Sequence, residues 1–183
     1  MEKLFDDTLF VQKERPTKIT SQQDQQMFLE LAKECIENGY SGDDEQTIAE
    51  DLKELSMNDS GFEMAKDLDD EGSASYEMIG DFIDWLDGIS YKRSSILKEN
   101  VKLWVKAHKP QPLYEKGVKL KIVESLSYTP SLRKDCLVYV TGMNTEEAYY
   151  TISEDENKKG GYVLPYEKVE QNCIIVESLI DNH

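Results

Sequence analysis

The sequence predicts an α+β protein in which a helical module is followed by a small antiparallel β-unit. Throughout residues 21–109, apolar side chains recur at spacings of three and four, as they do along one face of an α-helix. After KPQP, at 109–112, the apolar period becomes two, which is the alternation of a half-buried strand. We therefore predict a lead-in segment at 1–20, an acidic helical module at 21–109 and the β-unit at 113–180.

The first predicted helix begins at Ser21, which acts as the N-cap with Asp24 as its capping-box partner. It ends near Asn38, because Gly39 follows and glycine favours the backbone conformation of a helix end. Its apolar face holds Met27, Phe28, Leu31, Cys35 and Ile36.

The next two predicted helices are shorter. One follows a cap at Asp43 and Asp44, and its apolar stripe is formed by Ile48, Leu52 and Leu55. The other spans residues 61–68 and precedes an acidic loop.

Two more helices complete the module, which has about five. Ser73 or Ser75 caps the fourth helix, which ends at Gly88. Its apolar stripe holds Tyr76, Ile79, Ile83 and Leu86. The fifth starts at Ser90 and stops before the prolines of KPQP, because proline cannot continue a helix. Its inner side holds Leu97, Val101, Trp104, Val105 and His108.

Five short segments with alternating apolar residues are predicted to form strands. They are 118–123, 136–142, 148–153, 161–165 and 173–178. The segment PYEKVEQN, before the last strand, has room for a single 3₁₀ turn, and strands this short suit a small closed barrel. Through the layout of Gly161–Ser178, this part resembles the SH3-like barrel family, whose last two strands are commonly separated by one such turn. The resemblance implies a fold and no ligand.

The negative charge is concentrated in one stretch of the chain. The net charge is −16, and residues 37–90 hold 17 acidic side chains against two basic ones. Residues 91–127 are basic, with nine Lys and Arg against three Asp and Glu. A strong negative field repels phosphate backbones, so we do not expect the acidic stretch to bind nucleic acid directly. It favours a basic, nucleic-acid-binding protein as partner.

No catalytic pattern stands out. Cys35, Cys136 and Cys173 lie far apart and form no metal-binding motif, which leaves His108 without a cysteine nearby in the sequence. The Gly-Gly pair at 160–161 is not followed by the helix and Lys-Ser/Thr of a phosphate-binding loop. We therefore expect a non-enzymatic protein that needs no cofactor and no metal.

The stretch DLDDEGSASYEM, at 67–78, nearly opens an EF-hand calcium loop, because acids stand at loop positions 1, 3 and 5 and glycine at 6. Position 12 requires a bidentate glutamate, but it is Met78, and Glu77 falls one residue early. We interpret the stretch as a solvated acidic loop, with weak binding of a divalent cation as the alternative.

The predicted partner-binding residues are Asp43, Asp44, Asp67, Asp69, Asp70, Glu71, Glu77, Asp81, Asp84 and Asp87. Asp84 and Asp87 fall in the last turn of the predicted fourth helix, where the helix dipole disfavours negative charge. They either meet Lys92 and Arg93 across the following turn and cancel them, or belong to a field presented to a partner. In the second case, neutralising Asp81, Asp84 and Asp87 together weakens binding without unfolding the protein.

A basic stripe lies on the fifth predicted helix and is formed by Lys98, Lys102, Lys106 and Lys109. We interpret it as a solvated surface or a partner for the acidic segment. Contact with RNA or a phosphate group is the alternative.

The acidic segments GYSGDDEQTIAEDL, DLDDEGSASYEM and GDFIDWLDG resemble in composition the small inhibitors encoded by phages and mobile elements, including anti-CRISPR and anti-restriction proteins. The resemblance implies that the protein occludes the nucleic-acid site of an enzyme such as Cas9 or another CRISPR effector. The alternative is an SH3-like accessory module of a larger assembly. That module would dock through barrel side chains such as Tyr149, Tyr150, Tyr162 and Tyr166.

The sequence also lacks targeting signals. No apolar run reaches the roughly 18 to 20 residues that span a bilayer, and residues 1–20 lack the pattern of a secretory signal. We therefore expect a cytoplasmic protein that does not bind membranes. Its lead-in segment carries apolar side chains that can dock on a partner or on the barrel: Leu4, Phe5, Leu9, Phe10 and Val11.

Overall fold

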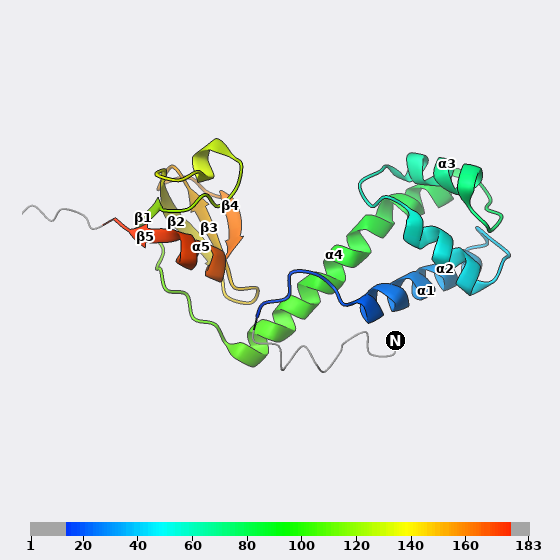
Figure 1. Cartoon of the computed structure of the whole chain (residues 1–183), viewed down its shortest axis with the longest axis horizontal. Coiled ribbons are helices and arrows are strands. Elements are labelled where there is room, and N and C mark those ends of the chain that lie inside the picture. Colours follow the sequence, from blue (N-terminus) through cyan, green and yellow to red (C-terminus); the bar gives the residue numbers. More distant parts are fainter. Residues whose placement is uncertain (1–13, 177–183) are drawn as a thin grey trace, which may run out of the picture. The chain divides into compact units, whose positions relative to one another are not determined.

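The computed structural model describes residues 14–176 and confirms an α+β protein (Figure 1). The chain forms two compact units, and the boundary between them falls between Trp104 and Val105, inside a long helix. The first unit is helical and the second contains the sheet. Residues 1–13 of the predicted lead-in segment and 177–180 of the predicted β-unit lie outside the described residues.

Helix α1 (Ser21–Glu37) is capped by Thr20 and not by Ser21. Thr20 Oγ1 accepts a hydrogen bond from the Gln23 N–H at 3.2 Å, and the Gln23 side chain accepts one from the Thr20 N–H at 3.1 Å. These two bonds form a capping box. The predicted cap, Ser21 with Asp24, is therefore one residue too late in the chain. Thr20 and Ser21 both carry a hydroxyl that can cap a helix, so the sequence did not distinguish them.

Helices α2 (Glu45–Glu54) and α3 (Gly61–Glu71) follow. Asp44 caps α2 as predicted, by accepting from two backbone N–H groups of the first turn. Ser60 caps α3, which continues beyond the predicted end at residue 68. The first half of the acidic stretch is therefore helical.

The predicted fourth and fifth helices are a single helix, α4 (Gly80–His108). The predicted break at Gly88 is absent, because Phe82, Leu86 and Ile89 continue one buried stripe across it. A glycine inside a helix costs only about 1 kcal/mol relative to alanine, whereas full burial of a large apolar side chain contributes about 1.5 to 3 kcal/mol. The described residues thus form four α-helices before the sheet, and a fifth, α5 (Tyr166–Asn172), lies between the last two strands in the chain.

Helix α4 begins at Gly80 and not at the predicted caps, Ser73 and Ser75. The N–H groups of these serines donate to the side chains of Asp51 and Asp43. Backbone groups engaged in this way hold the segment in a loop, so the helix starts only after it.

The core of the helical unit receives side chains from all four helices. The largest fully buried ones are Phe28, Leu31, Ile48, Leu52, Met64, Phe82, Leu86 and Ile89. Gly61 allows α3 to approach α4, because a Cβ at this position would lie 2.2 Å from the carbonyl oxygen of Ile83. The contact between α3 and α4 therefore requires glycine.

A buried pair of amides fixes the register of α1 against α4. Gln23 and Asn100 are 2% and 0% exposed, and their side chains exchange two hydrogen bonds of 2.9 Å. A buried amide that loses its partner costs the full desolvation of its polar atoms. The pair therefore disfavours any other register of the two helices.

The second unit is a five-stranded antiparallel sheet in the order β4-β3-β2-β1-β5. The strands are β1 (Lys119–Ile122), β2 (Leu137–Asn144), β3 (Tyr149–Ser153), β4 (Tyr162–Pro165) and β5 (Cys173–Ile175), with the 3₁₀ helix η2 (Pro130–Leu132) before β2. Among the described strands, β4 and β5 are the two edges and do not pair, so the sheet is not closed. The closed barrel is thus not shown, and the SH3-like fold stays a prediction.

Helix α5 (Tyr166–Asn172) replaces the single 3₁₀ turn predicted for this segment. Tyr166 and Val169 are three residues apart, and both are buried. The Tyr166 ring packs on Tyr150 of β3, with 4.4 Å between ring centroids. Burial of two side chains on one face stabilises this α-helix, which is longer than the 3₁₀ turn predicted from the length of the segment.

Asn100→Leu leaves the buried Gln23 amide without its partner on α4. We expect the free energy of unfolding of the helical unit to fall by about 1 to 3 kcal/mol. Urea unfolding followed by far-ultraviolet circular dichroism measures the change. Ser95→Leu, at an exposed position of the same helix, is the control and should change stability by less than about 0.5 kcal/mol. An equally small effect of Asn100→Leu would contradict the role of the amide pair.

Candidate protein-binding surface

The acidic stretch 67–78 is half helix and half loop. Asp67, Asp69 and Glu71 lie in the last turns of α3, where side chains two residues apart point about 200° away from each other. They therefore cannot surround one cation as the alternating ligands of an EF-hand loop do. No group of three or more His, Cys, Asp or Glu in the part of the chain that the structure describes is placed to hold a metal ion.

The second half of the stretch binds carboxylates. The N–H groups of residues 73–74 donate to the Asp51 side chain at 2.8 to 3.0 Å, and the Tyr76 hydroxyl donates to it at 2.9 Å. Asp43 accepts from the Ser75 N–H at 2.7 Å. These bonds fasten the loop to α2 and to the segment before it. The sequence analysis did not identify Asp51, because its partners are backbone groups distant in the chain.

The Tyr76 side chain is enclosed by this arrangement. Its ring stacks on Phe82, with 5.6 Å between the centroids. Burial, and then the hydrogen bond to Asp51, raise the pKa of the Tyr76 phenol well above its ordinary value. The phenol therefore remains a proton donor to Asp51 at neutral pH.

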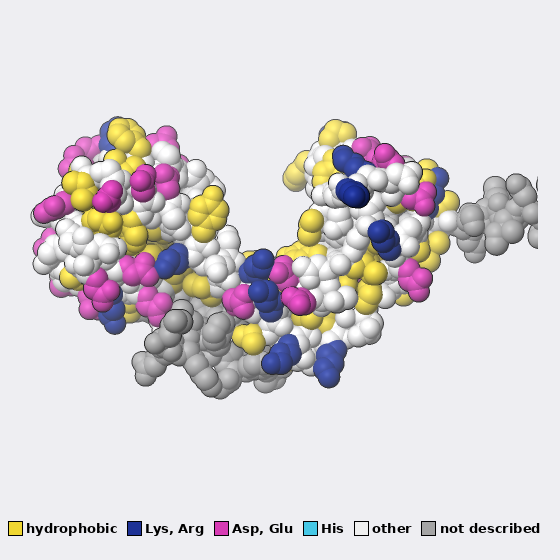
Figure 2. All heavy atoms as spheres, turned by 180° about the vertical axis from the view of Figure 1, so that it is seen from behind, with side chains coloured by type: hydrophobic (Ala, Val, Ile, Leu, Met, Phe, Trp, Pro, Cys, Tyr) yellow, Lys and Arg dark blue, Asp and Glu magenta, His cyan; other side chains and the backbone are white. Residues whose placement is uncertain are grey.

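The predicted acidic residues fall into two groups. Asp43, Asp44 and Asp87 are bonded within the fold, the last by accepting from the Gly61 N–H. The others expose carboxylates that form no hydrogen bond or ion pair with any described residue: Asp67, Asp69, Asp70, Glu71, Glu77, Asp81 and Asp84. Figure 2 shows acidic side chains spread over this face of the helical unit, with few lysines or arginines among them. A partner can bind this second group without breaking an internal contact.

An acidic hollow of about 590 Å³ lies between α2 and α3. Its walls carry one lysine, Lys53, and five carboxylates, those of Glu50, Asp51, Glu54, Asp67 and Glu71. Asp51 is bonded to the loop, and Glu50 accepts from the Gln46 amide at 2.7 Å. Glu54, Asp67 and Glu71 remain exposed to solvent. The hollow can accommodate a cationic side chain.

Asp67 and Glu71 were predicted to bind a partner, whereas the opposite wall on α2 was not predicted. A signal for that wall exists in the spacing of Glu50 and Glu54, which stand four residues apart, as do Asp67 and Glu71. Each pair therefore projects from one side of its helix. The pairing of the two walls was not visible, because it depends on how α2 and α3 pack.

The predicted cancellation of charges across a turn at Gly88 is wrong, because α4 continues through that position. Asp84 and Asp87 thus lie inside a helix, and the helix-end dipole does not act on them as supposed. Lys92 and Arg93 bind carboxylates of α1, with Lys92 Nζ 2.8 Å from the side chain of one of them. These two cations fix α1 to α4.

The basic stripe lies on α4 as far as Lys106, and Lys109 follows the helix with a φ of +48°. Lys102 Nζ lies 2.7 Å from Glu99 Oε1. Lys102 is therefore paired on its own helix, as a lysine of a solvated surface can be. Contact with RNA or phosphate stays a prediction.

The tyrosines of the accessory-module alternative have different positions. Tyr150 and Tyr166 are buried in the β-unit, whereas Tyr149 and Tyr162 are half-buried. The exposed large apolar side chains of this unit are Leu113, Tyr128, Leu137, Met143, Val163, Ile174 and Ile175. These side chains are more accessible to a partner than the tyrosines are.

Comparison with protein-family models, curated proteins and solved structures finds no match for this chain. The described helices include none with the length and apolar run needed to cross a membrane. The functional argument therefore rests on the surface of this chain alone.

In the native chain, the N–H groups of residues 73–74 and the Tyr76 hydroxyl all donate to the Asp51 carboxylate. Asp51→Asn replaces this carboxylate with a neutral amide. We expect the free energy of unfolding to fall by about 2 kcal/mol, because hydrogen bonds to charged groups contribute about 1.5 to 3 kcal/mol. Urea unfolding checks this. Glu54→Gln removes the same charge from an exposed position of α2 and serves as the control. Equal midpoints for the two variants would show that Asp51 does not fasten the loop.

Proposed function

We propose that this protein binds a basic protein through the acidic surface of its helical unit and occludes that partner's nucleic-acid site. Inhibitors of the anti-CRISPR type, directed at Cas9 or another CRISPR effector, are the kind of protein it resembles. The observation that carries the proposal is the hollow between α2 and α3, where Glu54, Asp67 and Glu71 face solvent and have no partner within residues 14–176.

This arrangement lowers the stability of the chain that contains it. Glu50 and Glu54 are like charges four residues apart on α2, and Asp67 and Glu71 repeat this spacing on α3. Each such pair destabilises its helix by roughly 0.2 to 0.5 kcal/mol. Local destabilisation without internal compensation is typical of a surface that has a binding role.

The hollow suits an arginine or lysine of the partner. A guanidinium binds carboxylates through two parallel hydrogen bonds, which are stronger than bonds between neutral groups. Outside the hollow, Asp81, Asp84 and the other exposed carboxylates extend the negative field, which accelerates encounter with a positively charged groove. In that groove the carboxylates take the place of phosphate groups.

The proposed role includes neither catalysis nor a cofactor, and it places the protein in the cytoplasm with its target. Direct binding of nucleic acid by the acidic face is disfavoured, since phosphates would meet like charge. The partner is therefore the basic enzyme itself.

A second candidate function is that of an accessory module, with the SH3-like fold, that docks through the sheet. One row of the sheet favours it: Ile174, Lys121 and Leu137 are directly paired across β5, β1 and β2. Ile174 and Leu137 are exposed, and Lys121 between them is half-buried. A partner bound through this row would be held mainly by apolar contact and would resist salt.

The triple variant Glu54→Gln, Asp67→Asn, Glu71→Gln tests the first proposal. The tagged chain captures partners from bacterial lysate supplemented with Cas9 and guide RNA, and a salt gradient elutes them for mass spectrometry. We expect the native chain to retain a nucleic-acid-binding protein that elutes at moderate salt, because the Debye length falls from about 10 Å at 0.1 M to 3 Å at 1 M. The triple variant should lose about tenfold in affinity for it.

A matched control neutralises three exposed carboxylates of the other unit, with Glu124→Gln, Glu154→Gln and Glu156→Gln. It changes the net charge by the same amount and should retain the partner. The first triple variant should also unfold at slightly higher urea, since it relieves repulsion between like charges. Equal loss in both triples, or full retention by the first, would contradict binding at the hollow.

Ile174→Ser tests the accessory module in the same capture. If the chain docks through the sheet, we expect it to capture a partner that resists elution by salt. Ile174→Ser should lose this partner, and the triple variant of α2 and α3 should retain it. Val163→Ser, at an exposed position of the edge strand β4, is the control. Loss with both serine variants would indicate a disturbed sheet.

A further inference from the structure

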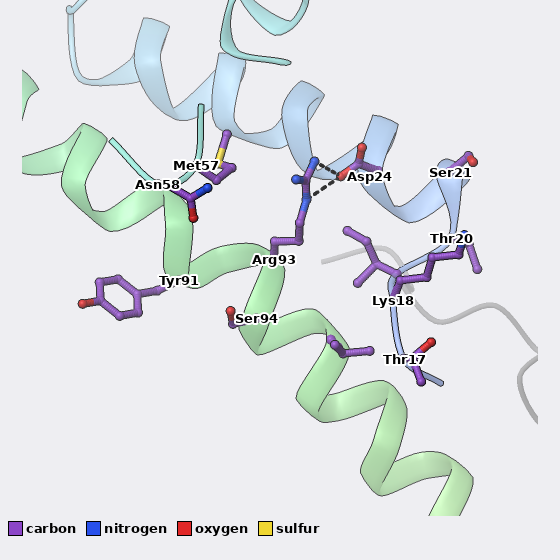
Figure 3. A pocket seen from close by; sticks show the side chains of 12 residues that line it. Thr17, Lys18, Thr20, Ser21, Asp24, Met57, Asn58, Tyr91, Arg93 and Ser94 are labelled. Atoms are coloured by element: carbon purple, nitrogen blue, oxygen red, sulfur yellow. Dashed lines mark hydrogen bonds and ion pairs between the residues drawn. The ribbon is translucent and has the colours of Figure 1, made fainter. Parts of the chain in front are cut away.

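A groove of about 820 Å³ runs along the helical unit, and Figure 3 shows its three walls. One wall is formed by residues 17–20 and the start of α1, which contributes Ser21 and Asp24. Helix α4 forms another wall, and the loop at 57–58 forms the third. The volume falls within the range of roughly 300 to 1,000 Å³ that is usual for ligand-binding sites. None of the carboxylates of the acidic hollow lines it.

The groove carries two cations and one carboxylate, although it belongs to the acidic helical unit. Arg93 donates from Nε and Nη2 to the same oxygen of Asp24, with Nε at 2.9 Å. Its side chain is 41% exposed, and the two bonds to Asp24 leave the donors of Nη1 for another group. Lys18 stands on the opposite wall and is exposed. Arg93 and Lys18 together suit an acidic ligand.

Apolar side chains border these cations. Tyr91 on α4 is 75% exposed, and Ile19, Met57 and Leu97 are half-buried around the groove. A partly exposed aromatic ring beside cationic groups is the composition expected of a site for a peptide that carries both apolar and acidic residues.

We infer that residues 4–11 of this chain, LFDDTLFV, occupy the groove. The segment places Asp6 and Asp7 between two apolar groups of residues, which complements a groove with two cations and apolar borders. Asp6 and Asp7 face Lys18 and the free donors of Arg93, while the Leu and Phe side chains cover Tyr91 and its apolar neighbours.

The position of the chain also supports this occupant. Arg15 and Pro16 are buried on the helical unit, and residues 17–20 after them form a groove wall. The proposed occupant is therefore attached to the chain directly beside the groove. Ten extended residues span at most about 34 Å, so the segment between Phe5 and Arg15 has ample length to enter a groove whose wall begins at residue 17.

Disulfide cross-linking in the full chain tests the inference. Phe5→Cys is combined with Asn58→Cys on the groove wall, or with Glu37→Cys at the far end of α1 as the control, in a Cys136→Ser background. Cys35 and Cys173 are buried, and burial raises the pKa of each thiol to about 11, so they react slowly. The α1 rise separates residue 37 from residue 21 by about 24 Å, which an unattached segment could still reach.

Docking in the groove predicts that the cross-link to position 58 forms within monomers about tenfold faster than the cross-link to position 37. Adding Asp6→Asn and Asp7→Asn should reduce this preference by at least half, with the fold unchanged by circular dichroism. Equal rates at the two positions would overturn the inference. Disulfide-linked dimers would overturn it in favour of a second copy supplying the segment. The cross-link does not involve the acidic hollow, so it can fail or succeed independently of the proposed function.

Discussion

The continuity of α4 is the constraint on which the rest of the helical unit depends. Its first half supplies Phe82, Leu86 and Ile89 to the core, and its second half supplies Asn100 to the buried amide pair with α1. A break at Gly88 would separate these two sets of contacts. Because the helix is unbroken, one rigid element sets the position of α1 and the approach of α3, and through them the two surfaces discussed above.

The same element explains how the charges are divided. Cations on α4 bind α1 carboxylates, and Asp51 and Asp43 bind the loop that precedes α4. Acidic side chains with such partners hold segments of the helical unit together. Glu54 of α2 and Asp67 and Glu71 of α3 have no such partner among the described residues, so repulsion from neighbouring like charges is not compensated within the fold. The binding proposal rests on this division more than on the net charge.

Much of the fold follows from patterns in the sequence. Apolar periods located the helices, the strands and the change between them, and Asp44 was recognised as a cap. The errors arise where distant contacts decide. Gly88 and KPQP look alike as breakers in a local pattern, but only tertiary burial of Ile89 shows that the glycine is tolerated. The role of Asp51 and the pairing of the α2 and α3 walls could not be predicted, since both depend on packing between segments far apart in the chain.

Hydrogen exchange of the backbone amides around Gly88 in the full chain tests this account most directly. In a continuous helix, the amides of Ile89 to Lys92 are bonded to carbonyls of the preceding turn and should be protected as strongly as those of Leu86 and Asp87. Two helices meeting at Gly88 would leave the first amides of the second helix without partners. Fast exchange confined to residues 89–92 would therefore contradict the account.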